Sequence, residues 1–131
     1  MPIPTELLTA MTDRLTPNGG PATADDAAMV WSRVFARFNP LIGPVSTQAL
    51  FARALALHQH AFPWLPQVPT PDQAQQAFDS FTLALDGQQA DALLAANRAL
   101  LVTYSTELAE LIGARLATQF LRSAFPPDDA T

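Results

Sequence analysis

The two histidines, His58 and His60, are the side chains in this sequence best suited to bind a metal or to move a proton. They stand two positions apart, so on a helix they point about 200° away from each other and cannot hold one metal ion as an i, i+4 pair does. One histidine alone can still act as a base or bind haem. We favour a simpler interpretation, in which one caps the negative end of a helix and the other is packed.

Aromatic side chains near the histidines define a candidate ligand pocket. Phe62 and Trp64 come directly after them, and Tyr104 is the single tyrosine of the chain. A helical ligand-binding domain with a pocket lined by His58, His60, Phe62, Trp64 and Tyr104 is therefore one function to consider for a small-molecule ligand. An enclosed apolar cavity beside these polar groups would favour it, because ligand sites are concave and mostly apolar.

Catalytic and metal-binding motifs are missing from the rest of the chain. Glu107 and Glu110 stand beside Arg115, and a di-iron bundle would need Glu-x-x-His, so we expect these side chains on a solvated face. The serines lack the glycines of a nucleophile elbow, and the loop PNGGPA has no following lysine to make it a phosphate loop. We predict no enzyme activity, no metal site and no cofactor.

Composition argues against two classes of partner. The 131 residues carry a net charge of -5, with seven scattered arginines and no lysine, an absence that indicates compositional bias. A nucleic acid or an anionic membrane surface requires a basic face, so neither partner is expected. The chain has no cysteine, no basic and apolar signal at its start, and no run of about 18 apolar residues. We therefore expect a cytoplasmic protein.

Helical periodicity organises the first half of the chain. It predicts a short helix over Thr5–Leu15, a loop over residues 16–22, and a second helix from Thr23 or Ala24 that ends at Asn39 and Pro40. The stretch 41–64 is apolar on most sides, which predicts a helix buried at the centre of the fold, with Phe62 and Trp64 as an aromatic plug after it. Pro63 and Pro66 end this helix.

The strongest helix start lies after a proline-rich crossover. Thr70 is a good N-cap, Pro71 suits the first helical position and Gln73 can complete a capping box. The helix that follows is expected to end at Asp86 and Gly87.

From residue 88 to residue 124 the chain has no proline and one glycine, Gly113. One unbroken helix would extend about 54 Å. A break at residues 103–106 or a bend at Gly113 would instead fold both halves onto the core. An unbroken helix would expose an apolar stripe that a second copy could cover. This candidate interface consists of Leu108, Leu111, Ile112, Leu116 and Phe120.

A weak internal repeat accompanies these helices. The tripeptide LIG stands at 41–43 and again at 111–113, and at that offset of 70 residues several apolar positions coincide. Identities are few, and helices share such spacing anyway. The pattern is compatible with a repeated three-helix unit and with coincidence.

We predict one all-α domain over residues 1–131, a bundle of five or six helices with a long, straight or kinked C-terminal helix and flexible ends at 1–4 and 126–131. The apolar content is high for so small a helical domain, which favours a surface that meets a partner. We expect an interaction or regulatory module that binds a second copy or another protein. A ligand-binding domain is the alternative.

Overall fold

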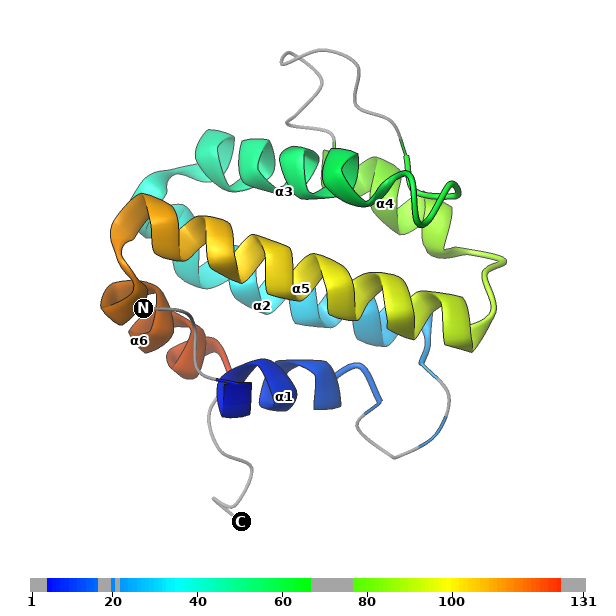
Figure 1. Ribbon diagram of the computed structural model, residues 1–131, viewed down its shortest axis with the longest axis horizontal. Coiled ribbons are helices and arrows are strands. Elements are labelled where there is room, and N and C mark those ends of the chain that lie inside the picture. Colours follow the sequence, from blue (N-terminus) through cyan, green and yellow to red (C-terminus); the bar gives the residue numbers. More distant parts are fainter. Residues whose placement is uncertain (1–4, 17–19, 21, 67–76, 126–131) are drawn as a thin grey trace.

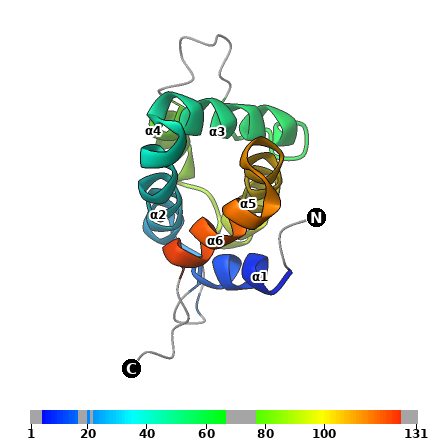
Figure 2. The ribbon, with the colours of Figure 1, turned by 90° about the vertical axis from the view of Figure 1, so that its left-hand side faces the viewer.

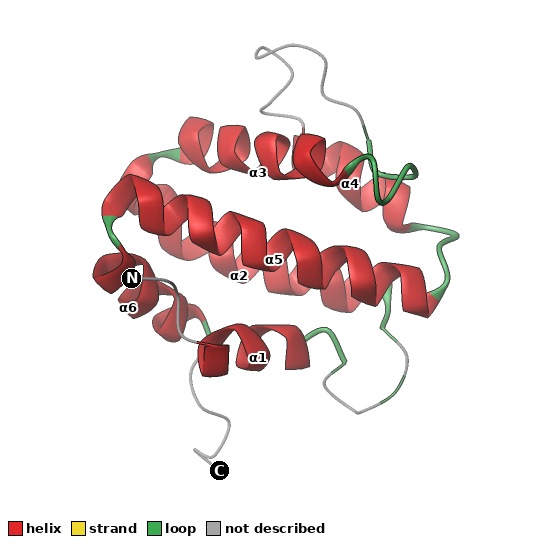
Figure 3. Ribbon diagram, in the orientation of Figure 1, coloured by secondary structure: helices red, strands yellow, loops and turns green. Residues whose placement is uncertain are grey.

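The computed structural model describes residues 5–16, 20, 22–66 and 77–125. In these residues the chain forms helices and no strand (Figures 1 and 3), which confirms the predicted all-α bundle of five or six helices. The helices are α1 (Thr5–Asp13), α2 (Ala24–Ile42), α3 (Pro44–His58), α4 (Ala77–Leu85), α5 (Ala90–Ile112) and α6 (Ala114–Ala124). The predicted helix start at residues 70–73 and the predicted flexible ends lie outside the described residues.

Helix α2 begins where the sequence predicts but continues past Pro40. Thr23 is the N-cap, and its hydroxyl accepts a hydrogen bond from the Asp26 N–H at 3.1 Å. The predicted end at Pro40 is wrong because a proline in the last turn removes a single helical hydrogen bond. The helix closes instead at Gly43, whose N–H donates to the Asn39 carbonyl at 2.9 Å.

The chain from residue 88 to residue 124 forms two helices that meet at Gly113. Its φ of 93° turns the backbone out of the helix, whereas α5 runs without interruption through residues 103–106. The C-terminal region therefore bends at the glycine, and α6 packs back against α5 and α2. An unbroken helix that overhangs the bundle, the premise of the candidate dimer interface, is not formed.

The LIG tripeptide is a helix corner that occurs twice. Gly43 and Gly113 have nearly the same backbone angles, with φ of 91° and 93° and ψ of 150° and 143°. In both corners the glycine N–H donates to the carbonyl four residues earlier at 2.9 Å, and the next helix begins at the following residue. Both corners lie at the same end of the bundle, on the left in Figure 1.

The pattern of buried positions also repeats with the offset of 70 residues. Most buried positions of α1, α2 and α3 have a buried counterpart in α4, α5 and α6. Along α3, and along α6 with the residue that follows it, the pairs are Thr47 and Ala117, Phe51 and Leu121, Ala54 and Ala124, and Leu55 and Phe125. The helices α1–α3 and α4–α6 are thus two structurally equivalent units, and the sequence pattern is a repeat in the structure.

The two units are interlocked rather than placed side by side. Helices α2 and α5 lie on opposite sides of the core, with α3 and α4 along one edge and α1 and α6 along the other (Figure 2). Helix α4 packs against α3 and α2, and α1 packs against α5 and α6, so the first helix of each unit contacts the other unit. One hydrophobic cluster contains residues from all six helices. The two units therefore share one hydrophobic core.

The centre of this core lies between α2 and α5. Trp31 and Tyr104 are fully buried there, and their rings meet edge to face at 5.4 Å. The Trp31 indole N–H donates to the Asn97 side-chain oxygen at 2.9 Å, a buried hydrogen bond between the two units. The prediction that α3 is buried on most sides is wrong, because Val45 and Leu57 are each 60% exposed. Much of the apolar pattern of α3 comes from alanines, whose small side chains expose little apolar surface when they face water.

Candidate functional site

Tyr104, one member of the predicted pocket, belongs to the core. Its hydroxyl donates to the Thr47 carbonyl at 3.0 Å, and that carbonyl lies at the start of α3 in the other unit. Burial, and next the charge of Glu107, raise the pKa of the Tyr104 hydroxyl far above its ordinary value. The phenol therefore stays protonated and joins the two units.

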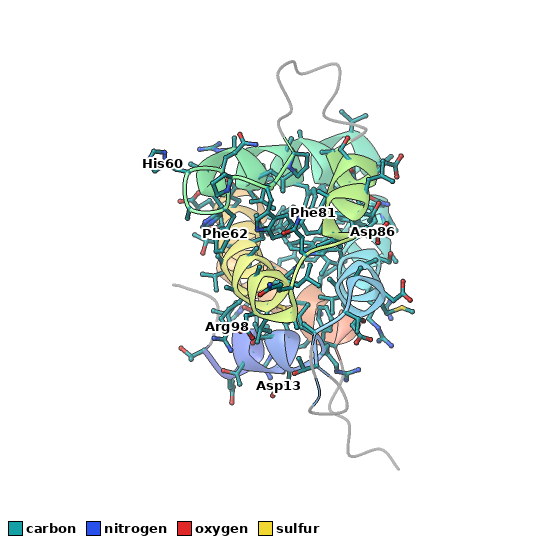
Figure 4. The ribbon with its side chains drawn as sticks, turned by 90° about the vertical axis from the view of Figure 1, so that its right-hand side faces the viewer. Asp13, His60, Phe62, Phe81, Asp86 and Arg98 are labelled. Carbon is teal, nitrogen blue, oxygen red and sulfur yellow. The ribbon has the colours of Figure 1, made fainter. Side chains whose placement is uncertain are left out.

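Of the other four predicted pocket residues, three lie against the bundle near the C-terminal end of α3, and His60 does not (Figure 4). His58 is half-buried, with its Nε2 at 2.5 Å from the Thr103 hydroxyl of α5. Phe62 and Trp64 are half-buried and pack against the edge of the core, so the aromatic plug is only partly enclosed. His60 is exposed and points away from the bundle (Figure 4). The five residues therefore do not converge on one point.

The predicted interface stripe is divided by the corner at Gly113. Leu108 is fully buried in the core, whereas Leu111 is 56% exposed. Phe120 is half-buried, and its ring lies 5.7 Å from the ring of Phe38 on α2. Ile112 and Leu116 are also half-buried. Because α6 folds back, most of these side chains contact the protein itself, and Leu111 is the one that remains largely in water.

An apolar surface does exist beside the C-terminal end of α3. His58 and Thr103 meet between two antiparallel helices, so the residues that precede them, Leu57 and Val102, emerge on the same side of the α3–α5 pair. Both are exposed, by 60% and 41%. We name this the α3 end surface and define it as the exposed pair Leu57 and Val102 together with Phe62 and Trp64, which are half-buried and follow α3 in the chain.

A buried carboxylate lies between the same two helices. Glu107 is 8% exposed, and its Oε1 is 3.3 Å from the Nε of Arg53, whose own side chain is largely exposed. Neither carboxylate oxygen has a hydrogen-bond partner within the described part of the chain. Burial raises the pKa of Glu107 most strongly, Arg53 lowers it, and Glu110 raises it. The prediction of a solvated face is wrong for Glu107, which stands three residues after Tyr104 and shares its inward direction.

A groove that the sequence did not predict lies between α2 and α6. Two adjoining hollows of about 320 and 340 Å³ lie there and share Ala36, Arg37 and Ser123 as lining residues. Arg33 lines the first hollow and Phe120 the second. No local motif marks this groove, because its two sides come from segments almost 90 residues apart.

Two further features of the described residues bear on chemistry. No group of three or more His, Asp or Glu side chains there is placed to hold a metal ion. None of the helices formed by these residues is both long and apolar enough to cross a membrane.

Comparison with known proteins gives no match to a family model, to a curated protein or to a solved structure.

Proposed function

We propose that this protein is a small helical interaction module that self-associates through the α3 end surface. The observation that supports the proposal is the joint exposure of Leu57 and Val102 on one side of the α3–α5 pair, and the segment that follows Leu57 adds the half-buried rings of Phe62 and Trp64. Covering apolar surface is favourable by about 25 cal/mol per Å². A complex in which a partner covers this cluster is therefore favoured over the separate chains.

The charge pattern around this surface supports the same function. Residues 54–66 and 99–106, the two segments that form it, contain no Asp, Glu, Lys or Arg. Arg53, Arg98 and Glu107 mark the edges of these segments. Protein interfaces commonly combine an uncharged, aromatic centre with a polar rim. A surface without charge in a chain of net charge -5 fits that anatomy.

A second copy is the partner that we favour. A twofold dimer needs one surface patch, since the same residues serve both chains. The four side chains cover less than the roughly 800 Å² per partner of a standard stable interface. We therefore expect weak, concentration-dependent association in the micromolar range.

Sedimentation equilibrium between about 10 and 300 µM tests the proposal, because a weak interface of this size forms over such concentrations. Wild-type protein should show a rising average mass, and the double variant Leu57→Ser/Val102→Ser should stay monomeric with unchanged helix content. Leu83→Ser is the matched control, because Leu83 is 75% exposed on α4 and lies outside the α3 end surface. A wild-type monomer at every concentration, or equal loss in the control, would refute self-association through this surface.

A further inference from the structure

We propose that the groove between α2 and α6 binds a small organic anion, a carboxylate or a phosphate joined to an apolar group. This inference goes beyond self-association and uses a different part of the surface. The groove is lined by Arg33 and Arg37 from α2 and by Ser123 from α6, with Pro40 and Phe120 at one end. Its hollows, about 320 and 340 Å³, fall at the lower end of the usual range for ligand pockets.

Charge in this groove has one sign. Beyond Asp26 in its first turn, α2 contains no Asp or Glu, and α6 contains none at all. Arg33 donates from Nη1 to the Ala124 carbonyl at 3.3 Å, at the C-terminal end of α6. Arg37 is exposed and has no hydrogen bond or ion pair with any described residue. No carboxylate among the described residues forms an ion pair with the arginines of this groove.

The internal repeat supplies a direct comparison. The pair α3 and α5 is equivalent to the pair α6 and α2, and at the offset of 70 residues Arg37 corresponds to Glu107 and Ser123 to Arg53. In the α3–α5 pair the protein provides both charges, with 3.3 Å between Arg53 and Glu107. In the α2–α6 pair an arginine stands where the other pair has its carboxylate. No described residue supplies a negative group to the α2–α6 groove, and we assign that group to a ligand.

The lining residues suit an oxyanion with an apolar body. Arg33 and Arg37 stand at i and i+4, so their side chains leave the same face of α2. A planar guanidinium group can donate two parallel hydrogen bonds to two oxygens of a carboxylate or a phosphate. The Ser123 hydroxyl can donate a further bond from the opposite wall. Phe120 and Pro40 offer apolar contact for the rest of the ligand.

Proline at position 40 adds an acceptor to the same groove. Because Pro40 has no backbone N–H, the carbonyl of Ala36 lacks its usual helical partner. Ala36 lines both hollows. A hydroxyl or amine on the ligand can donate to this carbonyl, so a molecule with an anionic group and a nearby donor fits better than a bare anion.

Amide NMR titration with phenyl phosphate, benzoate and inorganic phosphate tests the proposal at ligand concentrations up to about 20 mM, which covers millimolar affinity. Phenyl phosphate or benzoate should shift the resonances of Gln119 and Ser123 and should bind at least about fivefold more tightly than inorganic phosphate. The comparison of phenyl phosphate with benzoate identifies the preferred oxyanion. An absence of shifts at Gln119 and Ser123 with all three probes would overturn the proposal.

Matched variants assign the binding to the groove. Arg37→Gln should weaken binding at least about tenfold, whereas Arg115→Gln, which removes an exposed arginine of α6 outside the groove, should change it less than about twofold. Equal binding by wild type and Arg37→Gln would overturn the assignment. The variant Leu57→Ser/Val102→Ser should bind normally, which separates this site from the α3 end surface.

The chain's own carboxylates provide the remaining test. Asp128 and Asp129 follow α6 in the sequence and lie outside the described residues. If an external anion is the natural occupant, Asp128→Asn/Asp129→Asn should bind phenyl phosphate about as tightly as wild type does. Binding that appears only in this double variant would overturn the proposal, because the groove would then serve an internal anion.

Discussion

Glu107→Gln should stabilise this protein at neutral pH, although it removes one partner of an ion pair. The carboxylate is 8% exposed, and neither oxygen has a hydrogen-bond partner among the described residues. A buried polar group without a partner costs about 1–3 kcal/mol and a buried charge without one costs more, so the neutral amide of Gln is less unfavourable at this position than the carboxylate. Arg53 is 71% exposed, so the ion pair contributes only about 0–1 kcal/mol to the free energy of unfolding. The neutral amide should therefore raise the free energy of unfolding by about 1 kcal/mol near pH 7.5.

The pH dependence follows from the direction of the pKa shift. Burial raises the pKa of Glu107 in the folded protein, so between the unfolded and folded values the folded state binds more protons. Stability of the wild type should therefore fall as pH rises through that window, and Glu107→Gln should lack this contribution. The advantage of the variant should be full above the folded pKa and should disappear near pH 4, where Glu107 is protonated and already neutral.

Urea denaturation of both proteins at intervals from pH 4 to pH 8 measures this difference directly. Glu110→Gln is the control, because Glu110 is exposed one turn farther along α5 and its removal should change stability by less than about 0.5 kcal/mol. Arg53→Gln should destabilise the protein near pH 7.5 and have little effect near pH 4. If Glu107→Gln is less stable than wild type by the same amount at every pH, the raised pKa and the argument from burial are refuted.

Three other substitutions test the repeat, the core and a cap by chemical denaturation. Gly43→Ala and Gly113→Ala should each cost about 1–3 kcal/mol, because φ near 90° with extended ψ is a glycine conformation, and a cost at one corner alone would contradict their equivalence. Asn97→Ala should cost about 1–3 kcal/mol because it leaves the Trp31 indole N–H unpaired in the core, and strict additivity with Trp31→Phe would exclude the coupling. Thr23→Ala should cost about 0.5–2 kcal/mol, and an unchanged midpoint would show that this cap does not stabilise α2.

The equivalence of the two units explains why a repeat with few identical residues is visible in the structure. A helix bundle constrains which positions are buried more tightly than which apolar residue fills each position. Val34 and Tyr104 are equivalent and both buried, yet one is aliphatic and the other donates a hydrogen bond across the core. Asn97 and Ala27 are likewise equivalent and buried, and only Asn97 pairs with Trp31. The second unit thus carries two polar side chains, Asn97 and Tyr104, whose hydrogen-bond partners lie in the first unit.

Local signals in the sequence were sufficient to predict where helices start or bend, but they did not predict which of the helical side chains are buried. Thr23 and Gly113 mark a helix start and a bend because a cap and a glycine act within a few residues of their own position. Glu107 has an ordinary helical sequence around it, and a carboxylate in an amphipathic pattern is normally assigned to water. Its burial depends on α3, which begins more than 60 residues earlier and packs against that face of α5.

Sequence alone therefore determined the all-α class, the start of α2 at Thr23 and a bend at Gly113 as one of two alternatives, because these depend on hydrogen bonds and backbone angles of neighbouring residues. Tertiary structure decided which helices form the centre, how the two units interlock and where charge is left without a partner. The α3 end surface and the groove around Arg37 and Ser123 both arise between helices that are distant in the chain. Such sites are set by which helix faces pack together, and only the folded bundle brings those faces into contact.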